Sequence, residues 1–301
     1  MNALAEKLTT LKKEKDAVIM AHFYQENDIR EVADFVGDSF ELARRARDAG
    51  QSVIILCGVR FMVESAKILN PGKTVYLPAA DAGCPMADMI TKKDVLELRQ
   101  KYKDAAVVCY VNSSAAVKAV SDICCTSSSA VNIVRSLPEK RIIFIPDQNL
   151  GAYVAAAAPE KEIILFSGFC PIHHRVLAED VKKAEKARPG AVLAVHPECR
   201  PEVLEYADYI GSTAGILDHV RQSDALEFLI GTENGVLEIL QKELPHKRFY
   251  PLASDFICPD MKKTKLEDIL QCLKGERSPV ELSEEELTGA AKSLERMVAG
   301  K

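Results

Sequence analysis

One sequence pattern occurs three times along the chain at a nearly constant spacing. Each copy starts with a β-branched apolar run, reaches a polar triplet and continues into an amphipathic stretch. The triplets begin 88 and 86 residues apart, and they are His22-Phe23-Tyr24, Tyr110-Val111-Asn112 and His196-Pro197-Glu198. Because a period of this length is enough for a small domain, the 301-residue chain is expected to fold as three copies of one unit.

Other residues recur at fixed distances from the start of each triplet. An Asp follows twelve residues later, and a hydroxyl residue follows seventeen residues later. The aspartates are Asp34, Asp122 and Asp208, and the hydroxyl residues are Ser39, Ser127 and Thr213. Each unit closes with a Cys-Pro pair, 62, 60 and 62 residues after its triplet begins, at Cys84, Cys170 and Cys258. Chance is a poor explanation for such regular spacing.

Short apolar runs that alternate with helical stretches predict parallel sheets connected by right-handed crossovers. We therefore expect an α/β fold of three homologous three-layer αβα domains with small parallel sheets, arranged around a pseudo-three-fold axis. The predicted domains are residues 1–103 with an N-terminal helix, residues 104–189, and residues 190–301 with a C-terminal helical tail. The Glu-rich tail, residues 278–301, is expected to pack on the N-terminal helix.

Composition and charge exclude some classes of function. Lys and Arg number 39 against 44 Asp and Glu, and this net charge of −5 argues against nucleic acid or an anionic membrane as the main partner. The sequence has no apolar run of about eighteen residues, so no membrane span is expected. Residues 1–16 have the pattern of a charged amphipathic helix rather than a signal peptide, and we expect a cytoplasmic protein.

The triplets mark the predicted site, because ligands of open parallel sheets bind beyond the carboxyl ends of the strands. Six polar side chains would meet there: His22, Tyr24, Tyr110, Asn112, His196 and Glu198. These residue types provide general acid–base capacity and neutral hydrogen bonding. The three recurring hydroxyl residues precede amphipathic stretches, so they are either ordinary N-caps or part of an anion site built from helix N-termini without Lys or Arg.

The Cys-Pro cysteines form the second candidate site. The chain has nine cysteines, and in a reducing compartment they are not expected to form a disulfide framework. Three thiolates brought together by the repeat could hold zinc or an iron–sulfur cluster, and Pro directly after a ligand Cys is typical of iron–sulfur ligation. Three ligands for a [4Fe–4S] cluster would leave one iron open for catalysis. A zinc site and three unconnected buried cysteines remain as alternatives.

Other chemically interesting residues receive a structural interpretation. Asp34, Asp122 and Asp208 follow apolar helix faces and are interpreted as structural. The adjacent Cys124 and Cys125 are expected to pack in a core. His173 and His174, which follow Cys170, are either site residues or part of a solvated turn, and we favour the turn.

Several motifs together resemble the quinolinate synthase family, from the first predicted helix to about residue 273. They are AHFYQ, DFVGDS, GCPMADM, YVNS, CTS, HPEC, DYIGST and GTE. The resemblance implies a triangular protein of three αβα domains, with one [4Fe–4S] cluster held by one cysteine per domain. The matching ligands are Cys84, Cys170 and Cys258. It further implies the condensation of iminoaspartate with dihydroxyacetone phosphate to quinolinate, phosphate and two waters, in NAD biosynthesis.

The same resemblance implies roles for particular residues. Tyr24 matches a family tyrosine implicated in catalysis, and we expect it to share the proton transfers with His22 and Glu198, the last as a base. Tyr110 and His196 complete the set of expected catalytic residues. Substrate contacts are implied at His22, Ser39, Tyr110, Asn112, Ser127, His196, Glu198, Ser212 and Thr213.

Two other functional classes remain open at this point. Another non-redox [4Fe–4S] hydro-lyase acting on a small dicarboxylate would have the same cluster but would not form quinolinate. A non-catalytic iron or oxygen sensor would also bind a cluster, but it would need a DNA-binding or partner module, and the sequence has no basic helix. If the resemblance holds, the unstable iminoaspartate could be handed over by the enzyme that produces it.

Overall fold

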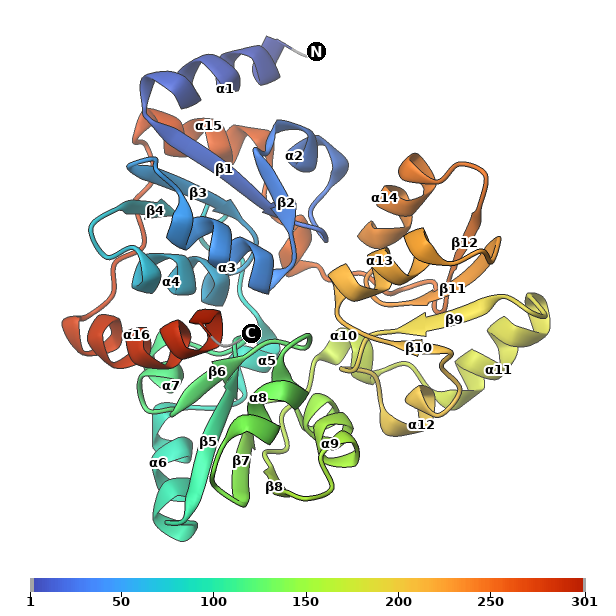
Figure 1. Ribbon diagram of the computed structural model, residues 1–301. Helices are drawn as coiled ribbons and strands as arrows, with labels where there is room; N and C mark the ends of the chain where they lie inside the picture. Colours follow the sequence, from blue (N-terminus) through green and yellow to red (C-terminus); the bar gives the residue numbers. More distant parts are fainter. Residues whose placement is uncertain (1–2, 300–301) are drawn as a thin grey trace.

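The computed structural model describes residues 3–299, which form three lobes around a common centre (Figure 1). Each lobe contains one four-stranded parallel sheet, and in every sheet the strands lie in the order second, first, third, fourth. The predicted α/β class with three αβα units is confirmed. Each sheet lies within one of the three predicted ranges, whereas the boundaries after residues 103 and 189 remain predictions.

The strands coincide with the apolar runs of the three repeats. The first sheet contains β1 (Ala17–His22), β2 (Phe35–Gly37), β3 (Val53–Cys57) and β4 (Thr74–Tyr76). The second contains β5 (Ala105–Tyr110), β6 (Ile123–Cys125), β7 (Arg141–Ile145) and β8 (Glu162–Leu165). The third contains β9 (Val192–Val195), β10 (Tyr209–Ile210), β11 (Glu227–Gly231) and β12 (Arg248–Pro251). The central strands are buried on both faces, as helix-covered parallel sheets require.

Helices cover both faces of the first sheet. One face is covered by α1 (Ala3–Glu14), α2 (Asn27–Val32) and α15 (Leu266–Lys274), and the other by α3 (Ser39–Asp48) and α4 (Arg60–Leu69). Alternate residues of β1 point to opposite faces, so Ile19 packs in the cluster of Leu8 while Met20 packs in the cluster of Leu42. Both faces of the strand are therefore apolar.

The other two lobes have the same layers (Figure 1). The second sheet lies between α6 (Lys92–Lys101) with α7 (Ala115–Ala119) and α8 (Ala130–Ser136) with α9 (Gln148–Ala157). The third lies between α11 (Ala178–Ala187) with α12 (Pro201–Leu204) and α13 (Thr213–Gln222) with α14 (Gly235–Glu243). Short helical turns follow the Cys-Pro pairs at α5 (Pro85–Asp88), α10 (Pro171–His174) and η1 (Asp260–Lys262).

After each Cys-Pro turn, the chain places its next helix on the following lobe. Arg99 of α6 donates to the carbonyl of Val120 at 2.9 Å, in the second lobe. Helix α11 buries Val181 in the core of the third lobe. Helix α15 buries Ile269 in the core of the first lobe, beside Leu8 of α1. The three lobes are thus joined in a closed ring.

The C-terminal helix α16 (Glu284–Ala299) packs on α7, β6 and α4, between the first two lobes. Gly289 allows this close approach, because a Cβ there would lie 2.8 Å from the Cβ of Ala119. The expectation that this tail packs on the N-terminal helix is wrong. That place is taken by α15, whose apolar face is buried against α1.

The recurring aspartates have the same structural role in each lobe. Each carboxylate accepts a hydrogen bond from a backbone N–H in the first strand of its own sheet. The pairs are Asp34 with Ile19 at 2.9 Å, Asp122 with Val107 at 2.7 Å, and Asp208 with Leu193 at 2.8 Å. The structural interpretation of these three residues is confirmed.

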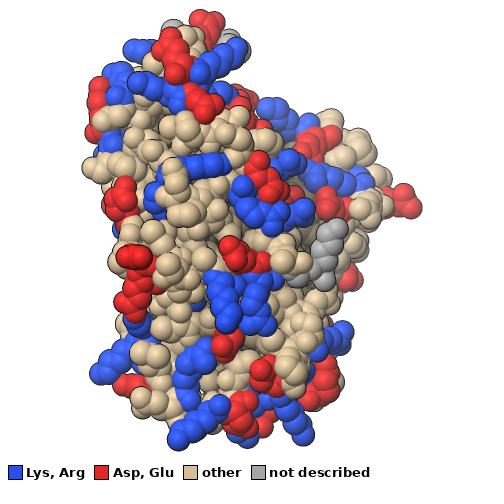
Figure 2. Space-filling view, turned by 60° about the vertical axis from the view of Figure 1, so that its left-hand side comes forward, with Lys and Arg blue, Asp and Glu red and all other residues tan. Residues whose placement is uncertain are grey.

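Within residues 3–299, no helix is both long and apolar enough to cross a membrane. On the face shown in Figure 2, Lys and Arg side chains are interspersed with Asp and Glu in small groups. This face therefore has no large patch of charge of one sign.

The closure of the ring can be tested at Ile269. We expect Ile269→Ala to lower the free energy of unfolding by about 2–5 kcal/mol, because it leaves a cavity between α15 and the first sheet. Urea unfolding measures the change, and the exposed Glu267→Ala on the same helix is the matched control, expected to change stability by less than about 1 kcal/mol. Equal effects of the two substitutions would contradict the packing of α15 described here.

Candidate functional site

The carboxyl ends of the central strands meet in a cavity of about 230 Å³ between the three lobes. All but one of the predicted site residues line this cavity. They are His22, Tyr24, Ser39, Cys84, Tyr110, Asn112, Ser127, Cys170, His196, Glu198, Thr213 and Cys258. The exception is Ser212, whose hydroxyl accepts a hydrogen bond from the amide of Gly215 at 3.2 Å as the N-cap of α13. Among the described residues, no Lys or Arg lines the cavity.

The hydroxyl residues lie at or near the starts of helices. Ser39 and Thr213 are the first residues of α3 and α13, and the caps of these helices are Asp38 and Ser212. Ser127 lies two residues before Ser129, the N-cap residue of α8. The alternative that these residues are N-caps is therefore wrong for Ser39, Ser127 and Thr213, since other residues cap the three helices, and all three line the cavity.

His22 and His196 have the same local geometry in two different lobes. The Nδ1 atom of each ring accepts a hydrogen bond from the amide two residues later, at 3.1 Å from Tyr24 and 3.3 Å from Glu198. The ring proton is therefore on Nε2, which can donate into the cavity. Burial lowers the pKa of His22 to about 3 and that of His196 to about 4, so both rings are neutral donors near pH 7.

Glu198 is a buried, ionised carboxylate of the site. Burial alone would raise its pKa, but His196, His173 and Tyr110 around the carboxylate hold the pKa at about 2. The side-chain amide of Asn112 lies 3.5 Å from its Oε1. Because the carboxylate is ionised and lines the cavity, it can accept a proton from a bound molecule.

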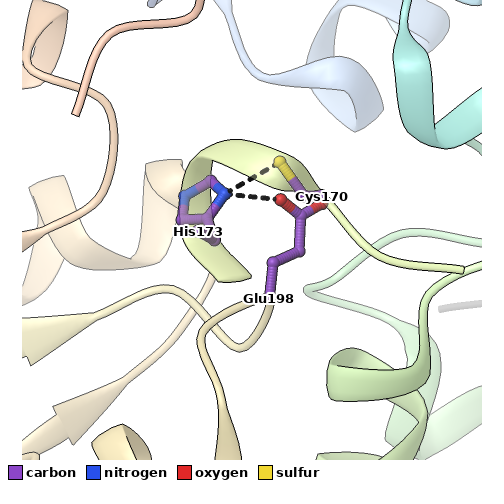
Figure 3. Close-up of side chains that lie close together, drawn as sticks. All are labelled: Cys170, His173 and Glu198. Atoms are coloured by element: carbon purple, nitrogen blue, oxygen red, sulfur yellow. Dashed lines mark hydrogen bonds and ion pairs between the residues drawn. The ribbon is translucent and has the colours of Figure 1, made fainter. Parts of the chain in front are cut away.

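His173 is a site residue that the sequence analysis assigned wrongly. Its side chain is 2% exposed rather than solvated, and it lines the cavity one helical turn after Cys170. Nδ1 lies 2.8 Å from Glu198 Oε2 and 3.3 Å from the sulfur of Cys170 (Figure 3). The only local signal was this spacing, because a ring three residues after a ligand cysteine lies on the same side of the turn.

Two tyrosines and an amide complete the polar lining. The Tyr24 hydroxyl lies 2.8 Å from each of the Oγ1 atoms of Thr213 and Thr232. Burial raises the pKa of both Tyr24 and Tyr110, so both phenols are protonated near pH 7. The Oδ1 atom of Asn112 is buried and has no hydrogen-bond partner among residues 3–299, which indicates a polar ligand group at this position.

The three Cys-Pro cysteines are presented in one common way. Cys84 and Cys170 are the N-cap residues of α5 and α10, and Cys258 directly precedes Pro259, the N-cap residue of η1. Each sulfur accepts a backbone hydrogen bond from the residue three positions later, which are Ala87, His173 and Met261. Burial nevertheless raises the pKa of Cys84 to about 12 and that of Cys258 to about 11. Without metal these thiols are protonated, and metal binding would displace their protons.

The chain was compared with known proteins. A family model described as "Quinolinate synthetase A protein" matches residues 6–299. The chain is 52% identical over 295 residues to the quinolinate synthase of Caldicellulosiruptor saccharolyticus, which covers 98% of this chain and 97% of the relative. It is 48% identical over 296 residues to quinolinate synthase 2 of Methanosarcina acetivorans, which covers 98% of this chain and 95% of the relative.

The chain belongs to the quinolinate synthase family. Membership is shown over nearly the whole length, and it implies an enzyme of NAD biosynthesis that carries an iron–sulfur cluster. The donor set suits such a group, since three thiols with backbone N–H bonds to sulfur line one cavity. Cys170, His173 and Glu198 also offer ligand atoms within 4.8 Å of one another, as a single metal ion would require. A cluster held by the three cysteines and a single metal ion held by Cys170, His173 and Glu198 would both need Cys170 as a ligand. The two sites therefore cannot be occupied together.

The neutral state of the two buried histidines predicts a pH dependence of stability. An unfolded histidine titrates near 6.5, so between pH 8 and pH 5 the unfolded chain binds protons that folded His22 and His196 do not. As the pH falls from 8 to 5, each ring therefore lowers the free energy of unfolding by about 2 kcal/mol. We expect the free energy of unfolding of the cluster-free His22→Gln variant to fall by about 2 kcal/mol less than that of the parent chain when the pH is lowered from 8 to 5. Urea unfolding at the two pH values measures this difference. An unchanged dependence would contradict a neutral His22.

Proposed function

We propose that this chain condenses iminoaspartate with dihydroxyacetone phosphate, giving quinolinate, phosphate and two waters, in the central cavity. The observation that carries the proposal is the meeting of three cysteines and the polar strand ends of three lobes in one cavity of a quinolinate synthase family member. The reaction needs no oxidant or reductant, and the cavity provides acid–base groups for its proton transfers. Hand-over of iminoaspartate from a producing enzyme remains a prediction.

We propose Cys84, Cys170 and Cys258 as the ligands of one [4Fe–4S] cluster. Their thiols line the same cavity, and each is followed by a turn that donates a backbone N–H to the sulfur. With three protein ligands, one iron keeps an open position, and the bound cluster would supply Lewis acidity for loss of water. The neighbouring residues would bind and orient the substrates.

The anionic groups of the substrates would bind to helix N-termini and neutral donors. Ser39 and Thr213 begin two ten-residue helices, and their hydroxyls would donate to these groups near the positive ends of the helix dipoles. The Asp38 carboxylate already accepts from the amides of Phe40, Glu41 and Ala214. The Nε2–H groups of His22 and His196 would donate to carboxylate or carbonyl oxygens. Asn112 Oδ1 would accept a hydrogen bond from a substrate amine or hydroxyl, which satisfies its buried oxygen.

Proton transfers are assigned to groups whose protonation states differ. The ionised carboxylate of Glu198 would act as the base, and the protonated phenol of Tyr24 can donate. The rings of His22 and His196 would orient the substrate rather than act as cationic acids, because both are neutral near pH 7. This pairing of an anionic acceptor with neutral donors suits a sequence of isomerisation and dehydration steps.

Replacement of one ligand tests the cluster assignment. Cys258→Ser is expected to lose cluster iron and quinolinate formation together after anaerobic purification, because its sulfur is one of only three protein ligands. Cys57→Ala is the matched control, since Cys57 is buried in the core of the first lobe, away from the cavity, and should keep both. Full iron content in Cys258→Ser would contradict the assignment. If the parent chain has its full iron content but forms no quinolinate, the result would indicate a dehydratase that acts on another substrate.

The role of Glu198 is tested by steady-state kinetics. Glu198→Gln keeps the size of the side chain but removes its charge, and it is expected to lower kcat on the order of 10²–10⁴-fold with unchanged iron content. The exposed Glu202→Gln should behave like the parent chain. Unchanged turnover of Glu198→Gln would disprove the base assignment.

A further inference from the structure

Each lobe has one further repeated position that the proposed function does not use. It lies 37 residues after the start of the triplet, two residues beyond the third strand of each sheet, and it is occupied by Val59, Asp147 and Glu233. Asp147 and Glu233 are each 0% exposed. Buried acidic side chains need hydrogen-bond partners, and in both lobes these partners include backbone N–H groups.

The Asp147 side chain joins the start of a helix to a cysteine turn. Its Oδ1 accepts hydrogen bonds from the amides of Asn149 and Leu150, both at 2.8 Å, and so caps α9. Its Oδ2 accepts from the amide of Cys170 at 3.1 Å. The two oxygens therefore have separate roles, since one holds the helix and the other holds the backbone of a proposed cluster ligand.

The backbone beside this contact is also fixed. Asp147 and Gly168 form a parallel β-bridge, and the amide of Gln148 donates to the carbonyl of Gly168 at 2.8 Å. Gly168 permits this close approach, because a Cβ there would lie 2.6 Å from the carbonyl oxygen of Pro146. The segment that leads into Cys170 is therefore held by backbone bonds at residue 168 and by the Asp147 side chain at residue 170.

Glu233 makes the corresponding contacts in the third lobe. Its Oε2 accepts from the amide of Gly235, the first residue of α14, at 2.7 Å, and its Oε1 accepts from the amide of Cys258 at 3.4 Å. Lys262 forms an ion pair with the same Oε1 at 3.1 Å. One oxygen on the helix start and the other on the cysteine amide thus occur in two lobes, although the two acidic side chains differ in length.

The first lobe holds its cysteine turn differently, because Val59 has no side-chain acceptor and α4 begins without a side-chain cap. The amide of Gly83, the residue before Cys84, instead donates to Asp260 Oδ1 at 3.2 Å. Asp260 follows Cys258 by two residues, so this bond connects two of the cysteine turns directly. In every turn, a carboxyl oxygen accepts from the amide of the cysteine or of the residue before it.

We propose that Asp147 and Glu233 are positioning residues that hold Cys170 and Cys258 in the orientation needed for cluster binding before the cluster is present. The proposal rests on the proposed function, which assigns these cysteines as ligands. A main chain that is fixed in advance loses less freedom when the sulfur binds iron, and groups that orient metal ligands increase metal affinity. Because Asp147 is not among the residues that line the cavity, a substitution there leaves the lining side chains in place.

Asp147→Asn tests the contact to Cys170 apart from the helix cap. The Oδ1 of the new side chain can still cap α9, whereas its Nδ2 presents a donor to the Cys170 amide in place of an acceptor. In the anaerobically purified, cluster-loaded protein, we expect the variant to lose its cluster to excess EDTA about 10–100-fold faster than the parent chain. Loss of the visible absorption of the cluster measures the rate.

Two further variants keep this test selective. Asp208→Asn is the matched control, because the Asp208 carboxylate also accepts from a backbone amide, that of Leu193 at 2.8 Å, but does not line the cavity or bond a cysteine turn. It should release the cluster at the parent rate. Asp147→Ser keeps a helix-capping oxygen on a side chain too short to reach Cys170, and it should reproduce the fast release of Asp147→Asn. Release at the parent rate in both Asp147 variants would overturn the proposal.

Amide exchange provides a readout that depends on neither the cluster nor quinolinate. In the cluster-free protein, the Cys170 amide should exchange at least about tenfold faster in Asp147→Asn than in the parent chain, while the amides of Asn149 and Leu150 keep their protection. Unchanged exchange at Cys170, or equal acceleration at all three amides, would overturn the positioning role. If the parent chain binds no cluster or forms no quinolinate while Cys170 alone is accelerated, the proposed function fails and the role of Asp147 in fixing Cys170 stands.

Discussion

The structure depends on the helix that follows each Cys-Pro turn, because that helix buries its apolar face on the next lobe. Helices α6 and α11 do so for the second and third lobes, and α15 closes the ring on the first lobe. A sheet with two apolar faces must be covered on both, so no lobe is complete without its neighbour. Since the chain crosses between lobes at each Cys-Pro turn, the three cysteines are brought to the common centre.

The same closure explains how the cavity can be polar and still stable. Strand ends from three lobes supply partners for one another, so that Glu198 is stabilised by His173 and Tyr110 without any Lys or Arg in the described lining. The neutral His22 and His196 and the ionised Glu198 in this lining have well-separated protonation states. A cavity of about 230 Å³ between the three lobes has room for small substrates.

Much of the fold and site could be predicted because the triplication repeats each signal three times. Regular spacing identified the strands, the recurring aspartates and all predicted cavity residues except Ser212. The errors concern contacts between distant segments. A histidine pair in a polar turn gives no local sign that Phe256 and His196 bury one ring, and the apolar face of α16 does not specify which groove receives it. Burial decided by another lobe is not encoded in the local pattern.

The central claim is that the ring brings three cysteines of one chain to one catalytic cluster. Metal and sulfide analysis of the parent chain, purified anaerobically from iron-replete cells and assayed for quinolinate on the same sample, tests it most directly. We expect about four irons and four sulfides per chain together with quinolinate formation from iminoaspartate and dihydroxyacetone phosphate. Zinc in place of iron, or quinolinate formation at full rate without iron, would contradict it.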